Sequence, residues 1–257
     1  MTRPWTVLKF GGTSVSTAAG WDVIADRARD VLRDGRAWIV CSALSQVSNR
    51  LEQAIDEALA EGPGTSIDWI EDRHRAFVQD LGLGESVADL DPALSDLRKL
   101  LEGVRLTAEA PARLRAKILA FGERLSTCLG VAALERRGVT ARRVDARELL
   151  TSRRRPGEGD GSRYLDADVE PIRDVERCER SAAGADVVLT QGFVASNARG
   201  ETCVLGRGGS DTSAALFARR LDARTLEIWT DVHGMFTADP RDIPTARLVR
   251  RLGYREA

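Results

Sequence analysis

Histidine and lysine are both scarce in this chain. Histidine occurs twice in 257 residues, at His74 and His233, and neither has a partner histidine at ligand spacing, which argues against a histidine metal site or a histidine base. Lysine occurs at Lys9, Lys99 and Lys117, so arginine supplies the rest of the 38 basic residues. A chain that uses arginine almost everywhere for positive charge therefore has a conspicuous lysine near its amino terminus.

Long apolar runs, a basic surplus and closely spaced cysteines are also absent. No apolar stretch approaches the roughly 20 residues of a membrane helix, and the first residues show no secretory signal. The net charge of −1 provides no basic field for nucleic acid. The four cysteines lie far apart without a C-x-x-C pair, which favours buried thiols in a reducing cytoplasm. We therefore expect a cytoplasmic protein that binds neither membrane nor nucleic acid and holds no metal through its own ligand cluster.

Strand-like and helix-like segments alternate along the chain. The sequence predicts strands at 5–10, 36–41, 139–144, 186–190 and 225–229, and a hairpin of 194–198 with 203–205. It predicts helices at 18–34, 47–60, 67–81, 92–101, 112–137, 171–183 and 210–220, and a loop at 151–162. The strand segments are mainly apolar rather than alternating, which is typical of a sheet covered by helices on both faces. The pattern predicts an α/β fold with a largely parallel central sheet.

The first predicted strand ends in a glycine-rich polar turn. Lys9 precedes Gly11 and Gly12, and Thr13 and Ser14 follow before a helix. Two glycines let a backbone turn sharply and bring its N–H groups close to an anion, which the amino end of a helix also favours. A lysine suits a phosphate oxygen as a compact charge. The alternative is a plain turn with a surface lysine, and this segment alone does not decide between them.

A second glycine-rich segment, GRGGSDTSAA, begins at Gly206 and also precedes a helix. Arg207 can hold a carboxylate or phosphate with two parallel hydrogen bonds. Asp211 cannot bind an anion, and it more plausibly orients a cation, either Arg207, Lys9 or a metal. A flexible loop in which Ser210 or Asp211 caps the helix is the alternative, but capping does not explain Arg207 or so many glycines.

A third polar segment, WTDVHGMFTADPR, follows the last predicted strand. Thr230 and Asp231 offer a hydroxyl and a carboxylate that could hold a nucleoside, and Arg241 could reach its phosphates. A structural turn is a serious competitor. Ligands collect at the carboxyl ends of strands in such sheets, so two anion sites and one nucleoside turn favour phosphoryl transfer. A carboxylate acceptor is already ionised at neutral pH and needs no base, which agrees with the shortage of histidine.

Taken together, these segments resemble the aspartokinases of the amino acid kinase family. The resemblance covers nearly the whole chain, from Val7 to about Ala257. FGERLS separates aspartokinases from relatives that phosphorylate other substrates. The matching pieces, in order, are KFGGTSV, SALSQVSNRL, FGERLS, LGRGGSDTSA, WTDVHGMFTADPR and RLGYREA.

The resemblance implies a three-layer α/β/α amino acid kinase fold and roles for individual residues. Lys9 and Asp211 would be catalytic, and Glu123 would meet the amino group of L-aspartate. The expected ATP-binding residues are Lys9, Phe10, Gly11, Gly12, Thr13, Ser14, Gly208, Gly209, Thr230, Asp231, Phe236 and Arg241. The expected substrate-binding residues are Ser42, Ser48, Glu123, Arg207, Ser210 and Asp211.

The implied reaction is phosphorylation of the L-aspartate side-chain carboxylate by ATP with nucleotide-bound Mg²⁺, the first step toward lysine, threonine and methionine. Residues 1–257 would form one catalytic domain, with substrate binding in about 1–185 and nucleotide binding in about 186–257. Alternatives are a kinase of the same fold for another acceptor, such as glutamate, N-acetylglutamate or UMP, and a non-catalytic ligand-binding module.

The chain also departs from the family pattern. His233 stands where many members have Asp, and Phe236 where many have Tyr. The family's Phe-Gly-x-Lys segment and paired ACT domains do not follow. We therefore expect a chain truncated at its carboxyl end, from a homo-oligomeric longer protein such as a bifunctional aspartate kinase/diaminopimelate decarboxylase.

Overall fold

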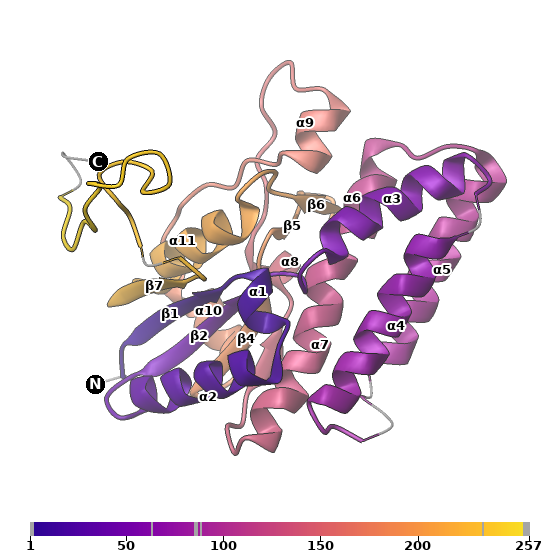
Figure 1. Ribbon diagram of the computed structural model, residues 1–257. Helices are drawn as coiled ribbons and strands as arrows, with labels where there is room; N and C mark the ends of the chain where they lie inside the picture. The colour runs from indigo at the N-terminus through magenta and orange to yellow at the C-terminus, as the bar shows by residue number, and fades with distance from the viewer. Residues whose placement is uncertain (1–2, 63, 85–86, 88, 233, 254–257) are drawn as a thin grey trace.

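Five strands form one parallel sheet, and two more form a separate hairpin (Figure 1). The computed structural model describes residues 3–62, 64–84, 87, 89–232 and 234–253. The strands are β1 (Trp5–Phe10), β2 (Arg36–Cys41), β3 (Arg142–Val144), β4 (Val187–Gln191), β5 (Val194–Ser196), β6 (Thr202–Val204) and β7 (Thr225–Trp229). The sheet has the order β3-β4-β2-β1-β7 with every neighbouring pair parallel, while β5 and β6 pair antiparallel. The predicted parallel sheet and hairpin are confirmed.

Helices connect the strands and cover the sheet. They are α1 (Gly12–Val15), α2 (Ala18–Leu32), α3 (Val47–Leu59), α4 (Thr65–Asp80), α5 (Leu90–Thr107), α6 (Ala112–Leu119), α7 (Phe121–Arg136), α8 (Ala146–Leu149), α9 (Asp160–Leu165), α10 (Val175–Ala182) and α11 (Gly209–Leu221). The single helix predicted at 112–137 is divided at Ala120, where a ψ of −14° redirects the chain. The predicted end of the loop at residue 162 was wrong, because α9 already begins at Asp160.

The sheet has an apolar core on each face. Along β1, Leu8 and Phe10 belong to the core beneath α2 and α7, whereas Trp5 and Val7 belong to the core beneath α10 and α11. Every residue of β1 is buried, because both faces are covered. The expected three-layer α/β/α arrangement is thereby confirmed. No described helix is long and apolar enough to cross a membrane.

The strand register brings four loop starts to one edge of the sheet. Phe10 pairs with Cys41 on one side and with Trp229 on the other, and Cys41 pairs with Gln191. The segments that leave β1, β2, β4 and β7 therefore start in one row at the carboxyl edge, where ligands of open α/β sheets bind. Strands from both sides of residue 185 share this sheet. The division into a substrate part and a nucleotide part stays a prediction.

Candidate active site

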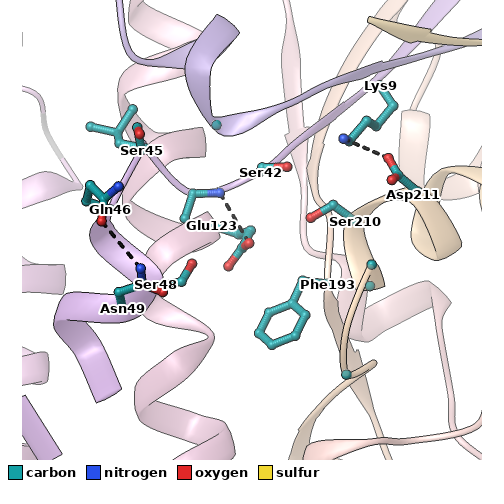
Figure 2. Close-up of a pocket in the computed structure, with 16 residues that line it drawn as sticks. Lys9, Ser42, Ser45, Gln46, Ser48, Asn49, Glu123, Phe193, Ser210 and Asp211 are labelled. Atoms are coloured by element: carbon teal, nitrogen blue, oxygen red, sulfur yellow. Dashed lines mark hydrogen bonds and ion pairs between the residues drawn. The ribbon is translucent and has the colours of Figure 1, made fainter. Parts of the chain in front are cut away.

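A pocket of about 420 Å³ opens at this carboxyl edge (Figure 2). It lies between the loops that follow β1 and β2, the start of α7, and the segment from Gly206 into α11. Its lining residues are Lys9, Gly12, Ser42, Ala43, Leu44, Ser45, Gln46, Ser48, Asn49, Glu123, Phe193, Gly206, Gly208, Gly209, Ser210 and Asp211. The pocket thus gathers many of the predicted substrate residues and part of the predicted ATP-binding set.

Lys9 forms an ion pair with Asp211 at one end of the pocket. Its side chain leaves β1 toward α11, and the residue is 8% exposed. Nζ of Lys9 lies 2.7 Å from Oδ1 of Asp211, whose carboxylate is half exposed in the first turn of α11. The amino end of a helix stabilises a carboxylate, so Asp211 is itself well placed to hold the ammonium group. This pair fixes a positive charge beside the two glycine-rich turns.

The glycines of these turns permit close approaches that a side chain would block. A Cβ at Gly12 would lie 3.0 Å from the carbonyl oxygen of Ala43, and one at Gly209 would lie 2.6 Å from Cδ2 of Phe193. Gly208 has a φ of +70° and precedes α11 without a side-chain cap. The amino end of α11 therefore meets the pocket with two glycines, which leave room for a ligand near the backbone, and with the side chains of Ser210 and Asp211.

A hydroxyl that the sequence analysis did not identify joins the loops after β1 and β2. Oγ of Ser16 donates to the carbonyl oxygen of Gly12 at 2.5 Å and accepts from the backbone N–H of Ser45 at 2.7 Å. Ser16 itself is buried. The first glycine turn and the polar loop after β2 are thus held as one unit, although they are far apart in sequence.

Glu123 lies in the middle of the pocket lining, on the first turn of α7. The residue is 3% exposed, and its Oε1 accepts from the backbone N–H of Ala43 at 3.2 Å. Its Oε2 is buried with no hydrogen-bond partner. Burial raises the pKa of Glu123 to about 8, against an ordinary value near 4.5. A buried carboxyl group without a cationic partner is suited to a ligand that brings a positive charge.

The rest of the pocket lining includes several polar, uncharged side chains. Ser42 and Ser48, both predicted, lie on the β2–α3 loop and α3, and Ser210 lies on α11. Gln46 and Asn49 also line the pocket, and Nδ2 of Asn49 donates to Oε1 of Gln46 at 3.3 Å. The sequence marked this loop as a polar turn, but no pattern singled out the Gln46–Asn49 pair.

Phe193 and Gly206 were also missed. Phe193 follows β4 with a φ of +62°, which no sequence signal indicates, because a bulky residue rarely adopts that conformation. Its ring stands in the pocket and packs beside Gly209. Gly206 has a φ of +68° and passes close to Asp166. The glycine-rich segment at 206–209 could have indicated Gly206, but the sequence carries no signal for the position of Phe193.

Several predicted residues of the first turn do not line the pocket. The ring of Phe10 is buried and stacks on Trp229 with centroids 5.9 Å apart, and its carbonyl oxygen accepts from the backbone N–H of Ser42. The backbone N–H of Gly11 donates to the carbonyl oxygen of Trp229 at 3.4 Å. Thr13 and Ser14 lie on α1, and Arg207 is exposed beside the pocket. Their assigned contacts stay predictions.

The segment after β7 also lies outside the pocket lining. Oγ1 of Thr230 lies 3.2 Å from Oδ1 of Asp231, and both residues are exposed. Arg241 pairs with Asp239 at 2.7 Å, and Phe236 is half-buried. His233 lies outside the described residues. The nucleotide contacts assigned to this segment are therefore neither confirmed nor excluded.

The geometry supports a ligand with charges of both signs. One end supplies a fixed ammonium group beside the glycine-rich start of α11 for an anion, and the middle supplies a carboxyl group for a cation. Among the residues that the structure describes, no group of three or more His, Cys, Asp or Glu side chains is placed to hold a metal ion.

Comparisons with known proteins agree with this reading. The bifunctional aspartokinase/homoserine dehydrogenase of Haemophilus influenzae is 34% identical over 98% of this chain and 31% of its own length. The lysine-sensitive aspartokinase 3 of Escherichia coli is 34% identical over 98% of this chain and 54% of its own length. The crystal structure of E. coli aspartokinase III in complex with aspartate and ADP has a TM-score of 0.75 and 32% identity, covering 95% of this chain and 53% of that chain.

The chain thus spans between about a third and about half of the length of these relatives. A sequence profile of the amino acid kinase family matches residues 4–257. That match includes β1 through β7 and every lining residue of the pocket. The chain belongs to the amino acid kinase family.

Proposed function

We propose that this chain transfers the γ-phosphoryl group of ATP to the side-chain carboxylate of L-aspartate, giving ADP and 4-phospho-L-aspartate. The observation that carries the proposal is the pocket itself, which places Lys9 and two glycine turns at one end and the buried, unpartnered Glu123 in its middle. Proteins named aspartokinases, including one solved with aspartate and ADP, support the choice of substrate. The product would enter the synthesis of lysine, threonine and methionine.

The acceptor would be bound through its charges. Glu123 would pair with the substrate ammonium group, which would supply a hydrogen-bond donor to the unpartnered Oε2. Hydroxyl groups of Ser42, Ser48 and Ser210 line the space around it and can donate to carboxylate oxygens. Arg207 is exposed close to the pocket and is the expected cation for a substrate carboxylate.

The transfer would proceed at the end that holds Lys9. A lone pair of the substrate carboxylate attacks the γ-phosphorus, the new O–P bond forms, and the bond to the bridging oxygen breaks to release ADP. Lys9 and the backbone amides near Gly12, Gly208 and Gly209 would offset charge on the transferred group. The attacking carboxylate is ionised at neutral pH, so no residue has to remove a proton.

Magnesium fits this site as part of the nucleotide. Mg²⁺ is commonly held by one or two carboxylates together with substrate phosphates, and Asp211 is the carboxylate at the Lys9 end of the pocket. Bound Mg²⁺ would offset negative charge on the phosphate oxygens. The expected contacts of Thr230, Asp231, Phe236 and Arg241 with the nucleotide, the homo-oligomeric assembly and the cytoplasmic location stay predictions.

The test is ADP formation with ATP, Mg²⁺ and L-aspartate, with hydroxylamine trapping of the acyl phosphate. Aspartate-dependent ADP and hydroxamate are the expected products. L-glutamate, N-acetyl-L-glutamate and UMP form the comparison panel, and the position of Glu123 predicts that an acceptor without a free amino group fails. Turnover with another panel member instead would replace the proposed acceptor. Nucleotide binding without any turnover would identify a non-catalytic module.

A further inference from the structure

Phe193 is the central residue of a tight turn, in a backbone conformation that its residue type disfavours. Its φ is +62°, and across it the backbone N–H of Val194 donates to the carbonyl oxygen of Gly192 at 2.6 Å. A three-residue turn closed by this hydrogen bond, with a positive φ at its centre, is the rare and strained form of the γ-turn. A bulky residue is an outlier there. The turn therefore needs a cause beyond the local sequence.

No helix end accounts for this turn. Phe193 lies between β4 and β5, whereas every other described non-glycine residue with a positive φ lies within two residues of a helix end. Those residues are Gln46, Glu61, Ala108, Ala183 and Asp222. Strained conformations persist where the surrounding structure fixes them, and they cluster at functional sites. Phe193 is at such a site, because it lines the pocket.

Contacts behind the turn fix the ring in place. The carbonyl oxygen of Phe193 accepts from the backbone N–H of Leu205 at 2.9 Å. A Cβ at Gly192 would lie 2.8 Å from Cβ of Ser210, and a Cβ at Gly209 would lie 2.6 Å from Cδ2 of Phe193. The turn is therefore packed directly against the start of α11. The ring has no room to move away from the pocket in that direction.

The ring bounds the space that an acceptor would occupy. In Figure 2 it lies across the pocket from Ser42, with Glu123 and Ser210 between them. An acceptor with its ammonium group at Glu123 and its reacting carboxylate toward Lys9 has both ends fixed, because Glu123 is buried and Lys9 is held in an ion pair. An acceptor that is longer by one methylene must bend sideways between these ends, and Phe193 fills one side of that space.

We propose that the ring of Phe193 limits the length of the acceptor, so that the site selects L-aspartate over L-glutamate. The proposal rests on the proposed function. The two amino acids carry the same charged groups and differ by one methylene, so charge alone does not separate them. A pocket that discriminates on a single methylene does so by about 10- to 200-fold. The strained turn then has a role, because it holds the ring against the acceptor.

Three substitutions grade the size of the side chain. Phe193→Leu keeps part of the volume, Phe193→Ala removes the ring, and Phe193→Gly removes the ring and also relieves the positive φ. The ratio of kcat/KM for L-aspartate to kcat/KM for L-glutamate should fall about ten-fold or more in the alanine and glycine variants, and less in the leucine variant. The KM for ATP should stay within about two-fold of the parent value. Leu106→Ala, 73% exposed on α5 outside the pocket, is the control.

Inhibitors of equal charge and different length test the same space without turnover of the acceptor. Succinate and glutarate each carry two carboxylates, and glutarate is longer by one methylene. Loss of the ring should strengthen inhibition by glutarate relative to succinate by about ten-fold. The glycine variant should also unfold about 2–4 °C above the alanine variant, because glycine adopts the positive φ without strain.

Three results would overturn the assignment. The aspartate-to-glutamate ratio could stay within about two-fold of the parent value in both the alanine and the glycine variant. The KM for ATP could rise while that ratio stays unchanged, which would place the ring beside the nucleotide. Glycine could restore the selectivity that alanine loses, which would indicate a purely conformational role. Aspartate-dependent turnover by the parent chain separates these failures from failure of the proposed function, which would show as no turnover and no aspartate-induced rise in unfolding temperature.

Discussion

Glu123 makes the affinity for aspartate depend on pH in a range where ordinary glutamates do not titrate. Burial raises its pKa to about 8, and only its ionised form can pair with a substrate ammonium group. About one molecule in 11 has an ionised Glu123 at pH 7, about half at pH 8 and about ten in 11 at pH 9. Since apparent affinity scales with the competent fraction, the KM for L-aspartate should fall about five-fold from pH 7 to 8, and about ten-fold by pH 9.

The assay is initial-rate ADP formation over a series of aspartate concentrations, from pH 6.5 to 9, with ATP saturating. Glu123→Gln keeps the shape of the side chain and removes its titration. It should raise the KM at pH 8 and abolish the pH dependence of the KM. A parent KM that stays constant across this range would refute the reasoning, since it would show either that Glu123 is already ionised at pH 7 or that it does not meet the ammonium group.

Three further outcomes follow from the same contacts. Ionisation of Glu123 is disfavoured in the folded state, so the free energy of unfolding falls as pH rises from about 4.5 to about 8. The ligand-free Glu123→Gln variant should not show this fall, and over this pH range its free energy of unfolding should come to exceed that of the parent by about 3–5 kcal/mol. Thermal unfolding at each pH measures the difference. Lys9→Ala should lower kcat by about 100-fold or more with a smaller change in the aspartate KM, whereas the exposed Lys99→Ala should not. Gly209→Ala, which meets the Phe193 ring, should destabilise the fold by about 1–3 kcal/mol in denaturant unfolding, and an unchanged midpoint would contradict this.

Most of the fold was predictable because its signals are local. The boundaries of β1, β2 and β7 were predicted to the residue, since short apolar segments end at glycine or polar residues. The division of the predicted 112–137 helix at Ala120 was not, because alanine carries no signal for a turn. The helix predicted from 171 begins at Val175, after Asp174, whose carboxylate accepts from the N–H of Arg177 as a cap.

The site was predictable where it depends on residue type and not where it depends on long-range contact. Gly208 and Gly209 were predictable from the glycine-rich segment before a helix, and Lys9 from the scarcity of lysine in the chain. By contrast, the raised pKa of Glu123 arises from its burial, which only the packed structure shows. The hydroxyl of Ser16 matters because of the loop that it touches, and that loop is brought to it by the pairing of β1 with β2.

The charges of the resting pocket explain why so few basic side chains suffice. Lys9 is neutralised by Asp211, and at pH 7 most molecules hold Glu123 protonated, so the pocket is close to neutral before ligands arrive. An ammonium ligand then has to drive a proton from Glu123, and a phosphate has to compete with Asp211 for Lys9. A ligand with only an ammonium group engages Glu123 but not Lys9, and a ligand with only an anionic group engages Lys9 but not Glu123. Selection by such a site therefore depends on a correct pair of charges at the correct separation, and neutral donors such as Ser42 and Ser48 can add specificity without adding charge.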